Sequence, residues 1–393
     1  MTKPLDGVTV LDLTRLLPGP AATMMLANFG AEVIKIEEPE KGDYARAGHP
    51  RIHGVGASFA LLNRGKKSVA INLKDPRGKD AFRRLATTAD VLIEGFRPGV
   101  MKRLDLGYEQ LRKLNPGLIH AALTGYGLDG SYTQTAGHDA NYLAMAGVLD
   151  LIGPSGGPPN LPGIQIADIA AGTLPAVIGI LLALAAREKS GEGQIVDAAM
   201  LDGCLNLMPI PLAQWTAAGE TPRRGETRLS GRYACYNLYE TSDGRWMSVG
   251  ALEHKFWVEL CRELDREDLI ADQYADDSRQ QEIKDELKRI FAGQSAAEWE
   301  RRFAARDACV ALVRDIEEVA ADKHVRDREL IVSIPHPEGG SFDYVGVVPK
   351  LSATPGEIGG PPPQLGEHTL PVLRAAGMDE DTLAELRSEG VIA

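Results

Sequence analysis

The stretch of residues 8–38, VTVLDLTRLLPGPAATMMLANFGAEVIKIEE, decides the predicted fold class of this chain. Residues 8–14 are apolar and β-branched as in a strand, residues 20–29 have the apolar spacing of a helix, and residues 31–37 are strand-like again. Pro20 suits the first turn of that helix because its ring presets a helical φ. A strand, a helix and a second strand form a β-α-β unit, which places the two strands parallel in one sheet.

Further strands alternate with helices along the first half of the chain. Strand patterns are predicted at 67–73, 90–94 and 118–124, with a helix at 76–87, and 194–203 passes from a strand into a helix. This alternation predicts an α/β fold, a Rossmann-like parallel sheet flanked by helices.

The second half predicts a smaller α+β domain. Residues 233–249 have the pattern of a hairpin that turns at Thr241-Ser242-Asp243-Gly244, and charged amphipathic helices fill about 256–306. Two short helices are predicted near the C-terminus, at 370–376 and 379–389. We therefore expect a large domain at 1–190, a linker at 191–231, a small domain at 232–325, and a return segment at 326–393 that completes the large domain.

Composition excludes several classes of protein. The chain has 393 residues and a formal charge of -12, which disfavours nucleic-acid binding because that requires a basic face. The apolar stretch 174–186 is interrupted by Gly179 and is shorter than the roughly 20 residues of a membrane-spanning helix, so no membrane segment is expected. The four cysteines are widely spaced and no secretory signal opens the chain, which favours reduced thiols, no zinc site and a cytoplasmic location.

The opening β-α-β unit also has the outline of a dinucleotide-binding unit, because it ends in Glu37 and Glu38. Its loop, RLLPGP at 15–20, contains one glycine where the fingerprint has three. A nicotinamide or flavin oxidoreductase is therefore disfavoured.

Two cationic segments stand at predicted strand ends. Residues 63–68, NRGKKS, come directly before one strand, and residues 95–99, GFRPG, directly after another. Turns at strand ends bind ligands in open α/β sheets, arginine clamps phosphate, and glycine lets a backbone approach a nucleotide. Composition alone favours the other interpretation, which is a solvated basic turn.

Ionisable side chains stand at predicted helix starts. His138 and Asp139 follow the glycine-rich loop 124–132, Asp168 precedes a long apolar helix, and Glu253 follows the strand 246–249. Free N–H groups at a helix start favour negative charge, including a developing oxyanion. Base rates alone favour ordinary caps or surface residues at these positions.

Taken in order, these segments resemble the class III CoA-transferase (CaiB/BaiF) family and, within it, the α-methylacyl-CoA racemases. The motifs that carry the resemblance span nearly the whole chain: PGP at 18–20, NRGKK at 63–67, FRP at 96–98, GYG at 125–127, the Asp168 segment, and LGEHT at 365–369. The resemblance implies a large CoA-binding domain from both chain ends, a small domain between them, and an interlocked homodimer.

The resemblance also implies residue roles. His138 and Asp168 are the two acid/base residues, and Glu253, from the small domain of the other subunit, orients and charges His138. The helix start at Asp139 can offer an N–H group to the enolate oxygen. The residues expected to bind CoA are Arg15, Lys35, Asn63, Arg64, Gly65, Lys67, Gly95, Arg97 and Tyr126. His254 is a departure, because related racemases often have proline there.

The resulting hypothesis is a racemase or epimerase of 2-methylacyl-CoA thioesters that moves a proton at the α-carbon through an enolate. It requires no cofactor beyond the CoA moiety of the substrate. The alternative is a CoA-transferase, in which Asp168 attacks an acyl-CoA and becomes an aspartyl-CoA thioester. His138 favours the racemase, since a transferase has no evident need of a base there. A noncatalytic acyl-CoA-binding protein is a third possibility, which the set of His138, Asp168 and Glu253 disfavours.

Overall fold

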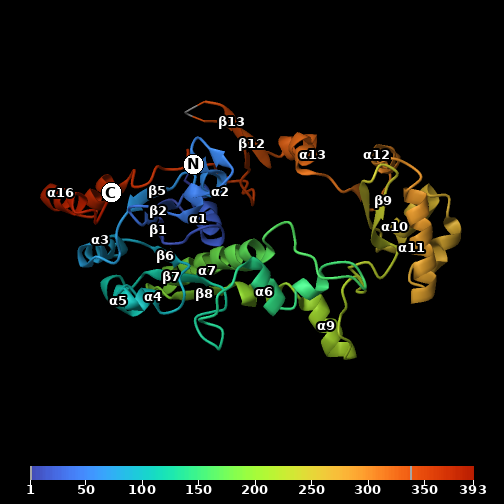
Figure 1. Ribbon diagram of the computed structural model, residues 1–393, viewed down its shortest axis with the longest axis horizontal. Helices are drawn as coiled ribbons and strands as arrows, with labels where there is room; N and C mark the ends of the chain where they lie inside the picture. Colours follow the sequence, from blue (N-terminus) through green and yellow to red (C-terminus); the bar gives the residue numbers. More distant parts are fainter. Residues whose placement is uncertain (1, 337–338) are drawn as a thin grey trace. The chain divides into compact units, whose positions relative to one another are not determined.

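The computed structural model describes residues 2–336 and 339–393 and divides the chain into two compact units. The first unit combines the chain up to Ala146 with Gly163–Leu207 and Lys323–Ala393. The second unit combines Gly147–Pro162 with Met208–Asp322. Each unit is therefore built from segments that are distant in sequence, as the blue and red segments of the first unit show (Figure 1).

A six-stranded parallel sheet organises the first unit in the order β5-β2-β1-β6-β7-β8. The strands are β1 (Thr9–Asp12), β2 (Glu32–Glu37), β5 (Lys67–Ala70), β6 (Val91–Glu94), β7 (Ile119–Thr124) and β8 (Ile195–Ala199). The predicted parallel sheet with flanking helices is confirmed. The chain adds β2 and β5 on one side of β1, and β6, β7 and β8 on the other. The direction of winding thus reverses between β1 and β6, where open α/β sheets bind their ligands.

One face of the sheet packs against α1 (Pro18–Asn28) and α7 (Leu174–Ser190). Successive strand residues point to opposite faces, so alternate positions form this core. They are Val10, Val33, Val91, Ile93, Ile119 and Ala121. Pro18 occupies the first turn of α1, two residues before the predicted start at Pro20.

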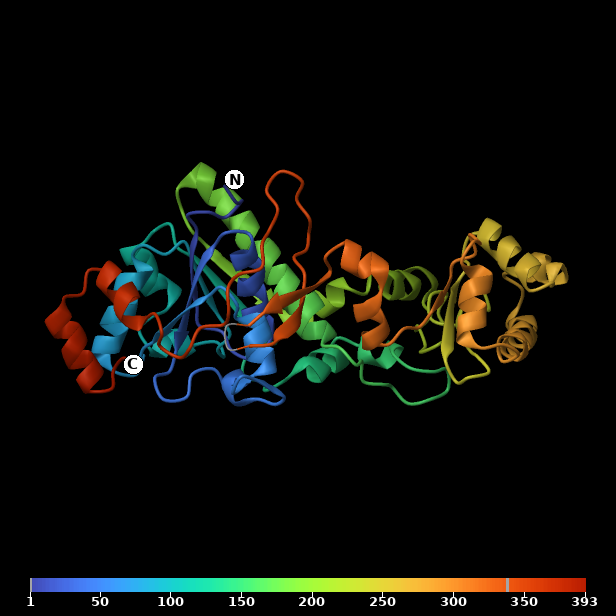
Figure 2. The same ribbon diagram turned by 90° about the horizontal axis from the view of Figure 1, so that it is seen from above.

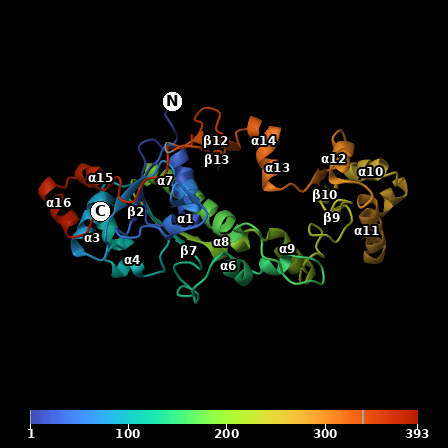
Figure 3. The same ribbon diagram turned by 45° about the horizontal axis from the view of Figure 1, so that its top comes forward.

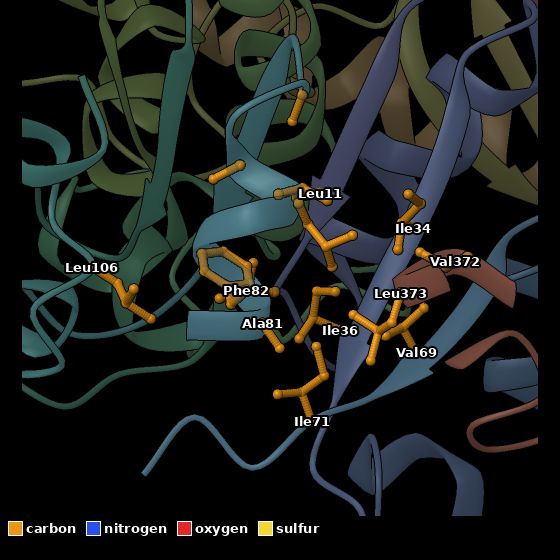
Figure 4. Close-up of a cluster of buried hydrophobic side chains, with 14 of the residues drawn as sticks. Leu11, Ile34, Ile36, Val69, Ile71, Ala81, Phe82, Leu106, Val372 and Leu373 are labelled. Carbon is orange, nitrogen blue, oxygen red and sulfur yellow. The ribbon is translucent and has the colours of Figure 1, made fainter. Parts of the chain in front are cut away.

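The opposite face packs against α3 (Pro76–Ala86), α4 (Val100–Arg103), α5 (Tyr108–Leu114) and the C-terminal helices α15 (Thr369–Ala375) and α16 (Glu380–Ser388). Figure 4 shows Leu11, Ile34 and Val69 of the strands beside Phe82 of α3 and Leu373 of α15. The C-terminal helices lie next to α3 in two views (Figures 1 and 2). The C-terminal helices therefore complete the helical layer that α3, α4 and α5 begin.

A continuous helix of 24 residues, Ala167–Ser190, joins the π-helix η3 (Ala167–Thr173) to α7. Its most apolar window has a mean hydropathy of 2.3, and by length and composition alone it could cross a membrane. The prediction of a shorter, interrupted stretch is wrong, because Gly179 continues the helix and lets Val196 of β8 pack close to its backbone. The residues of α7 buried on the unit are Ala176, Val177, Ile180 and Ala183. Ile178 and Leu182 point outward, 56% and 66% exposed.

Shorter elements connect and cover this framework. They are η1 (Tyr44–Ala47), β3 (Arg51–Ile52), β4 (Val55–Gly56), α2 (Ala57–Leu62), α6 (Asp139–Met145), α8 (Met200–Asn206), α14 (Lys323–Asp327), β12 (Ile331–Pro335) and β13 (Ser341–Val345). The hairpin of β3 and β4 was not predicted, because strands of two residues are too short for a periodic pattern.

The second unit is built on a three-stranded antiparallel sheet in the order β11-β10-β9. Its strands are β9 (Tyr236–Glu240), β10 (Trp246–Gly250) and β11 (Val310–Leu312). Its helices are η2 (Leu149–Leu151), α9 (Pro209–Ala218), α10 (His254–Glu263), η4 (Glu267–Asp272), α11 (Asp277–Phe291), α12 (Ala296–Phe303) and α13 (Ile316–Ala321). Figure 3 shows α10, α11 and α12 around β9 and β10. The predicted hairpin at Thr241–Gly244 is confirmed, with Thr241 N–H donating to the Arg245 carbonyl at 2.8 Å.

The unit boundaries differ from the predicted domains. Residues 191–207 form the edge strand β8 and helix α8 of the first unit, so they are not a linker. Residues 208–231 belong to the second unit, together with 147–162, which the sequence analysis placed in the large domain. The chain re-enters the first unit at Lys323, three positions before the predicted return at 326.

Candidate active site

A cavity of about 610 Å³ lies in the first unit at the carboxyl ends of β1, β6 and β7. It therefore occupies the position where the strand order reverses. Its walls include Arg15 after β1, Arg97 after β6, His138 at the start of α6, and Asp168 in η3. The predicted acid/base residues, which come from separate elements, thus line one cavity.

Two smaller cavities share walls with this one. A cavity of about 430 Å³ shares Phe96, Arg97 and His138 and extends to Tyr126. A cavity of about 200 Å³ shares Arg15 and Phe96 and extends to Lys74 beyond the ends of β2 and β5. Arg15 and Phe96 therefore separate the cavity that contains His138 and Asp168 from a second recess along the sheet edge.

His138 occupies the position just before α6 and is exposed at the cavity wall. Its backbone N–H donates to Asn141 Oδ1 at 3.0 Å, which fixes the start of the helix. The hydroxyl of Tyr142 donates to the Gly137 carbonyl at 2.5 Å. A Cβ at Gly125 or Gly137 would lie 2.5 or 2.7 Å from the Tyr142 ring, so the glycines of this loop allow it to close around that ring.

Asp168 is partly buried in the first turn of the π-helix η3. Its carbonyl accepts a hydrogen bond from Thr173 Oγ1 at 3.1 Å, and the same hydroxyl donates to the Pro18 carbonyl at 2.7 Å. The hydroxyl thereby ties the π-helical turn to the start of α1. Short π-helical segments occur frequently at functional sites.

The Asp139 carboxylate lies next to Asp168 and accepts the Asp168 backbone N–H at 2.9 Å. The N–H group of the helix start at Asp139 is predicted to contribute to the site, and that contribution stays a prediction. The structure adds a role for its side chain, which holds the turn that carries Asp168.

Burial, aided by the negative charge of Asp139 and opposed by His138, raises the pKa of Asp168 to about 6. Burial, aided mainly by the charge of Asp168, raises the pKa of Tyr142 to about 12, so its hydroxyl stays protonated at neutral pH. A carboxyl group that titrates near pH 6 can both accept and donate a proton near neutrality. The cavity therefore holds an imidazole and a carboxyl group that are both suited to proton transfer.

Several of the residues predicted to bind CoA line these cavities. Arg15, Gly95 and Arg97 line the main cavity, and Tyr126 lines the cavity of about 430 Å³. The Arg15 guanidinium lies near the rings of Tyr44 and Phe96, with Cζ 5.2 and 5.6 Å from the two centroids. The two exposed arginines give the cavity a cationic wall.

Lys35 does not line the cavity, contrary to the prediction, because its side chain is 0% exposed. It lies on β2, between β5 and β1 in the sheet. Its Nζ donates to the Thr14 carbonyl at 2.9 Å and lies 3.0 Å from Asp43 Oδ2. Its charge is therefore used inside the fold, beneath the loop that carries Arg15.

The loop Asn63–Lys67 does not reach these cavities in the described part of the chain. Asn63 is fully buried, Arg64 stacks over the Tyr344 ring with Cζ 4.3 Å from the centroid, and Lys67 pairs with Glu32. Gly65 N–H donates to the Gly360 carbonyl, and a Cβ at Gly65 would lie 2.9 Å from Gly359 Cα. This glycine therefore permits a close approach of the chain's own return segment.

Glu253 belongs to the second unit, where it is exposed at the start of α10. The adjacent His254 places Nδ1 3.1 Å from Gln273 Oε1, which anchors this helix start to the unit. The predicted action of Glu253 on His138 of another subunit stays a prediction.

Sequence reasoning missed Tyr44, Tyr142 and Phe96 as site residues. Tyr142 lies one helical turn after His138, so the segment that indicated the histidine also contained this signal. Phe96 belongs to the cationic motif after β6, whereas nothing local indicates Tyr44, whose stacking partner Arg15 is distant in sequence. Among residues 2–336 and 339–393, no group of three His, Cys, Asp or Glu side chains is arranged to hold a metal ion.

The family model described as CoA-transferase family III matches residues 5–369. The chain therefore belongs to CoA-transferase family III. It is 37% identical over 394 residues to the α-methylacyl-CoA racemase of Mus musculus, covering 99% of this chain and 97% of the racemase. It is 35% identical over 402 residues to the succinyl-CoA–D-citramalate CoA-transferase of Chloroflexus aurantiacus, covering 99% and 98% of the two chains.

The crystal structure of a CaiB/BaiF family protein from Brucella suis has the same fold, with a TM-score of 0.84 and 28% identity. The match covers 96% of this chain and 100% of that protein. The curated relatives include both racemases and CoA-transferases at similar identity. The family is therefore enzymatic, and similarity alone does not choose between the two reactions.

Proposed function

We propose that this protein is a racemase or epimerase of 2-methylacyl-CoA thioesters that acts by 1,1-proton transfer. The observation that carries the proposal is that His138 and Asp168 line one cavity from two separate elements. Inversion at the α-carbon requires a base on one face of the substrate and an acid on the other. The identity of 37% with a racemase also supports this choice.

In the proposed mechanism, Asp168 and His138 exchange roles with the direction of the reaction. When one removes the α-proton, the other donates a proton to the opposite face of the enolate. The pKa of Asp168 near 6 supports this exchange, because neither protonation state is costly near neutral pH. N–H groups at the start of α6 stabilise the enolate oxygen, and Glu253 of the second subunit orients His138.

The anionic CoA part of the substrate is assigned to the cationic wall of the cavity. Arg15 and Arg97 are exposed there, and Lys74 extends the positive charge into the adjoining recess. Guanidinium groups suit phosphate because they donate paired hydrogen bonds. The proposal includes no further cofactor, and it places the reaction in acyl-chain metabolism in the cytoplasm.

A CoA-transferase is the second candidate, and the observation that favours it is Asp168 itself. The carboxylate lines the cavity and forms no ion pair with a lysine or arginine among the described residues, so it is available to attack a thioester as a nucleophile. Relatives with this activity are 33% to 35% identical. His138 has no evident part in that reaction.

We also propose that two copies of the chain form a homodimer through the outer face of α7. Ile178, Leu181 and Leu182 are 56%, 41% and 66% exposed on this helix, and such an apolar surface is characteristic of an interface. Analytical ultracentrifugation should give twice the chain mass. The substitution Leu182→Asp should give the mass of one chain, and a single-chain mass for the unaltered protein would contradict the proposal.

Proton exchange without an acceptor acid separates the two candidate functions. An optically pure 2-methylacyl-CoA is incubated with the protein in deuterium oxide and followed by proton NMR. We expect loss of the α-proton signal together with loss of optical activity. His138→Ala should slow the exchange by about 10²- to 10⁴-fold, the usual contribution of a general acid or base.

The matched control is His324→Ala, which removes an exposed histidine on α14 and should leave the exchange rate unchanged. Absence of exchange, with CoA transfer after a carboxylic acid is added, would overturn the racemase proposal and make Asp168 the nucleophile of a transferase.

A further inference from the structure

The loop that carries Arg15 has an unusual backbone conformation. Leu16, directly after Arg15, has φ +66°, which a residue with a branched side chain rarely adopts without support from its surroundings. Its N–H donates to both carboxylate oxygens of Asp43, at 3.1 and 3.3 Å. The conformation is therefore held by a side chain that lies beyond β2 in the sequence.

Asp43 acts at a second point of the same cavity wall. Its Oδ1 accepts the Ala45 N–H at 2.9 Å and so caps η1, the turn that carries Tyr44. Tyr44 in turn contacts Arg15, because Arg15 Nη1 donates to the Tyr44 hydroxyl at 3.1 Å and Cζ lies 5.2 Å from the ring centroid. One carboxylate thus fixes the backbone next to Arg15 and the turn against which the guanidinium rests.

Lys35 neutralises this carboxylate inside the unit. Its Nζ lies 3.0 Å from Asp43 Oδ2, and the two side chains are 0% and 1% exposed. The same Nζ donates to the Thr14 carbonyl at 2.9 Å, on the other side of Arg15. The residues directly before and after Arg15 are therefore both bound to one buried ion pair.

Arg15 itself keeps its charge available. In the described part of the chain it contacts a phenol hydroxyl and two aromatic rings, and no carboxylate pairs with it. It also stands on the shared wall of the main cavity and the adjoining recess. A guanidinium that is held in place but not neutralised is suited to an anionic ligand.

We propose that the buried Lys35–Asp43 ion pair is a positioning device for ligand binding, which holds Arg15 at the cavity wall for the phosphate groups of a CoA thioester. This inference rests on the proposed function, because it takes the ligand to be CoA. Lys35 and Asp43 are positioning residues, since they act through Arg15 and touch no ligand. Their replacement should therefore weaken binding and leave turnover nearly unchanged.

A double-mutant cycle on CoA affinity tests the proposal. The paired variant Lys35→Met with Asp43→Asn avoids leaving one buried charge uncompensated. Isothermal titration with free CoA should show binding weakened about 10-fold or more by Arg15→Ala, as expected for a lost charge-assisted hydrogen bond. The paired variant should weaken binding about 5-fold. All three substitutions together should weaken it no more than Arg15→Ala alone, because the pair acts through Arg15.

Steady-state kinetics gives the second readout. The paired variant should raise KM about 5-fold while kcat stays within about 3-fold of the unaltered enzyme, because the reacting groups are untouched. Thr23→Val is the matched control: it alters a buried polar contact of the neighbouring Asp12 carboxylate, where Thr23 Oγ1 donates to Asp12 Oδ2 at 2.6 Å. It should lower the Tm without changing CoA affinity.

If the paired variant does not fold, Tyr44→Ala decides the question, since Tyr44 is 61% exposed and its loss does not threaten the core. It should weaken CoA binding by itself and add nothing to Arg15→Ala. The proposal would be overturned if the effects of the variants on CoA affinity multiplied independently. It would also be overturned if the paired variant or Tyr44→Ala bound CoA with unaltered affinity. CoA titration of the unaltered protein distinguishes failure of the proposed function from failure of the positioning role. If the unaltered protein does not bind CoA, the proposed function is wrong. If it binds CoA but the effects in the double-mutant cycle are additive, only the positioning role is wrong.

Discussion

Two carboxylates of the first unit, the buried Asp12 and the partly buried Asp168, have opposite surroundings. Asp12 Oδ1 accepts the Thr14 N–H and hydroxyl at 2.9 and 2.5 Å, and its Oδ2 accepts the Thr23 hydroxyl at 2.6 Å and lies 3.3 Å from Lys66 Nζ. Asp168 lies in the cavity wall beside another carboxylate, Asp139, which accepts its backbone N–H.

The surroundings set the pKa of each group. Burial raises the pKa of both, but the charges of Lys35 and Lys66 and the two threonine hydroxyls outweigh it at Asp12 and bring that pKa down to about 2. At Asp168 the charge of His138 is the one that opposes burial among the described residues, and the pKa rises to about 6. The comparison shows that burial alone does not set the pKa of a carboxyl group. The pKa falls where buried lysines and hydroxyls face the carboxylate, and it rises where they do not.

The largest expected effect is on stability and comes from Asp12→Asn. The substitution removes the negative charge beside the buried Lys66 amine, whose own pKa burial lowers to about 7. It should lower the free energy of unfolding at pH 7 by about 2–3 kcal/mol, which corresponds to the depression of the Asp12 pKa from 3.8 to about 2. A carboxyl group whose pKa is depressed in the folded protein stabilises the fold at pH values above its ordinary pKa. This stability is lost as the pH falls toward the depressed pKa. The difference from the unaltered protein should therefore shrink as the pH falls from about 4 toward 2.

Urea unfolding at fixed protein concentration measures this difference. Asp80→Asn is the control, because Asp80 forms an exposed ion pair with Arg83 on α3 and its loss should cost less than about 1 kcal/mol. An Asp12→Asn variant as stable as the Asp80→Asn variant would show that the buried pair contributes nothing to folding.

The opposite change in the free energy of unfolding is expected when Asp168 is replaced. Its pKa in the folded protein is raised above the ordinary value of 3.8 to about 6, so the ionised form is unfavourable in the folded state above pH 6. Asp168→Asn should therefore increase the free energy of unfolding at pH 8 by about 1–2 kcal/mol, and the gain should fall between pH 6 and pH 4 and vanish below. The variant should also lose proton exchange.

Unfolding curves at pH 8, 6 and 4 check this prediction. A loss of stability at pH 8, as at Asp12, would mean that Asp168 has a stabilising partner in solution and that the contrast between the two carboxylates is false.

Local patterns predicted the framework of the molecule well. The segments around β1, α1 and β2 each have their own periodicity, so residues 8–38 were sufficient to place them. The π-helical turn at Asp168 has no such signal, because it depends on the hydroxyl of Thr173 and on the Pro18 carbonyl of another helix. The presence of the long apolar helix could therefore be predicted, but not its start at Ala167 or the geometry of its first turn.

The candidate site was predicted where chemistry and loop position agree, and missed where a side chain meets a distant partner. Arg15, Arg97, His138 and Asp168 follow strands or begin helices at the ligand end of the sheet, and they do line the cavity. Lys35 was expected at the ligand because the family resemblance implied a basic residue at this position. Its partner Asp43 is visible only in three dimensions. The same holds for Gly65, whose backbone neighbour is the return segment at Gly359.

The smallest predicted effect isolates the charge of Asp139. Asp139→Asn keeps an amide oxygen that can accept the Asp168 N–H, and it removes the negative charge that helps to raise the pKa of Asp168. In the presence of Asp139→Asn, the stability gained through Asp168→Asn at pH 8 should therefore fall by about 0.5–1 kcal/mol, a coupling that a double-mutant cycle of unfolding free energies measures. An unchanged gain would mean that burial alone raises the pKa of Asp168. In that case the carboxylate of Asp139 only holds the turn, and the raised pKa of Asp168 would follow from its position in the cavity wall.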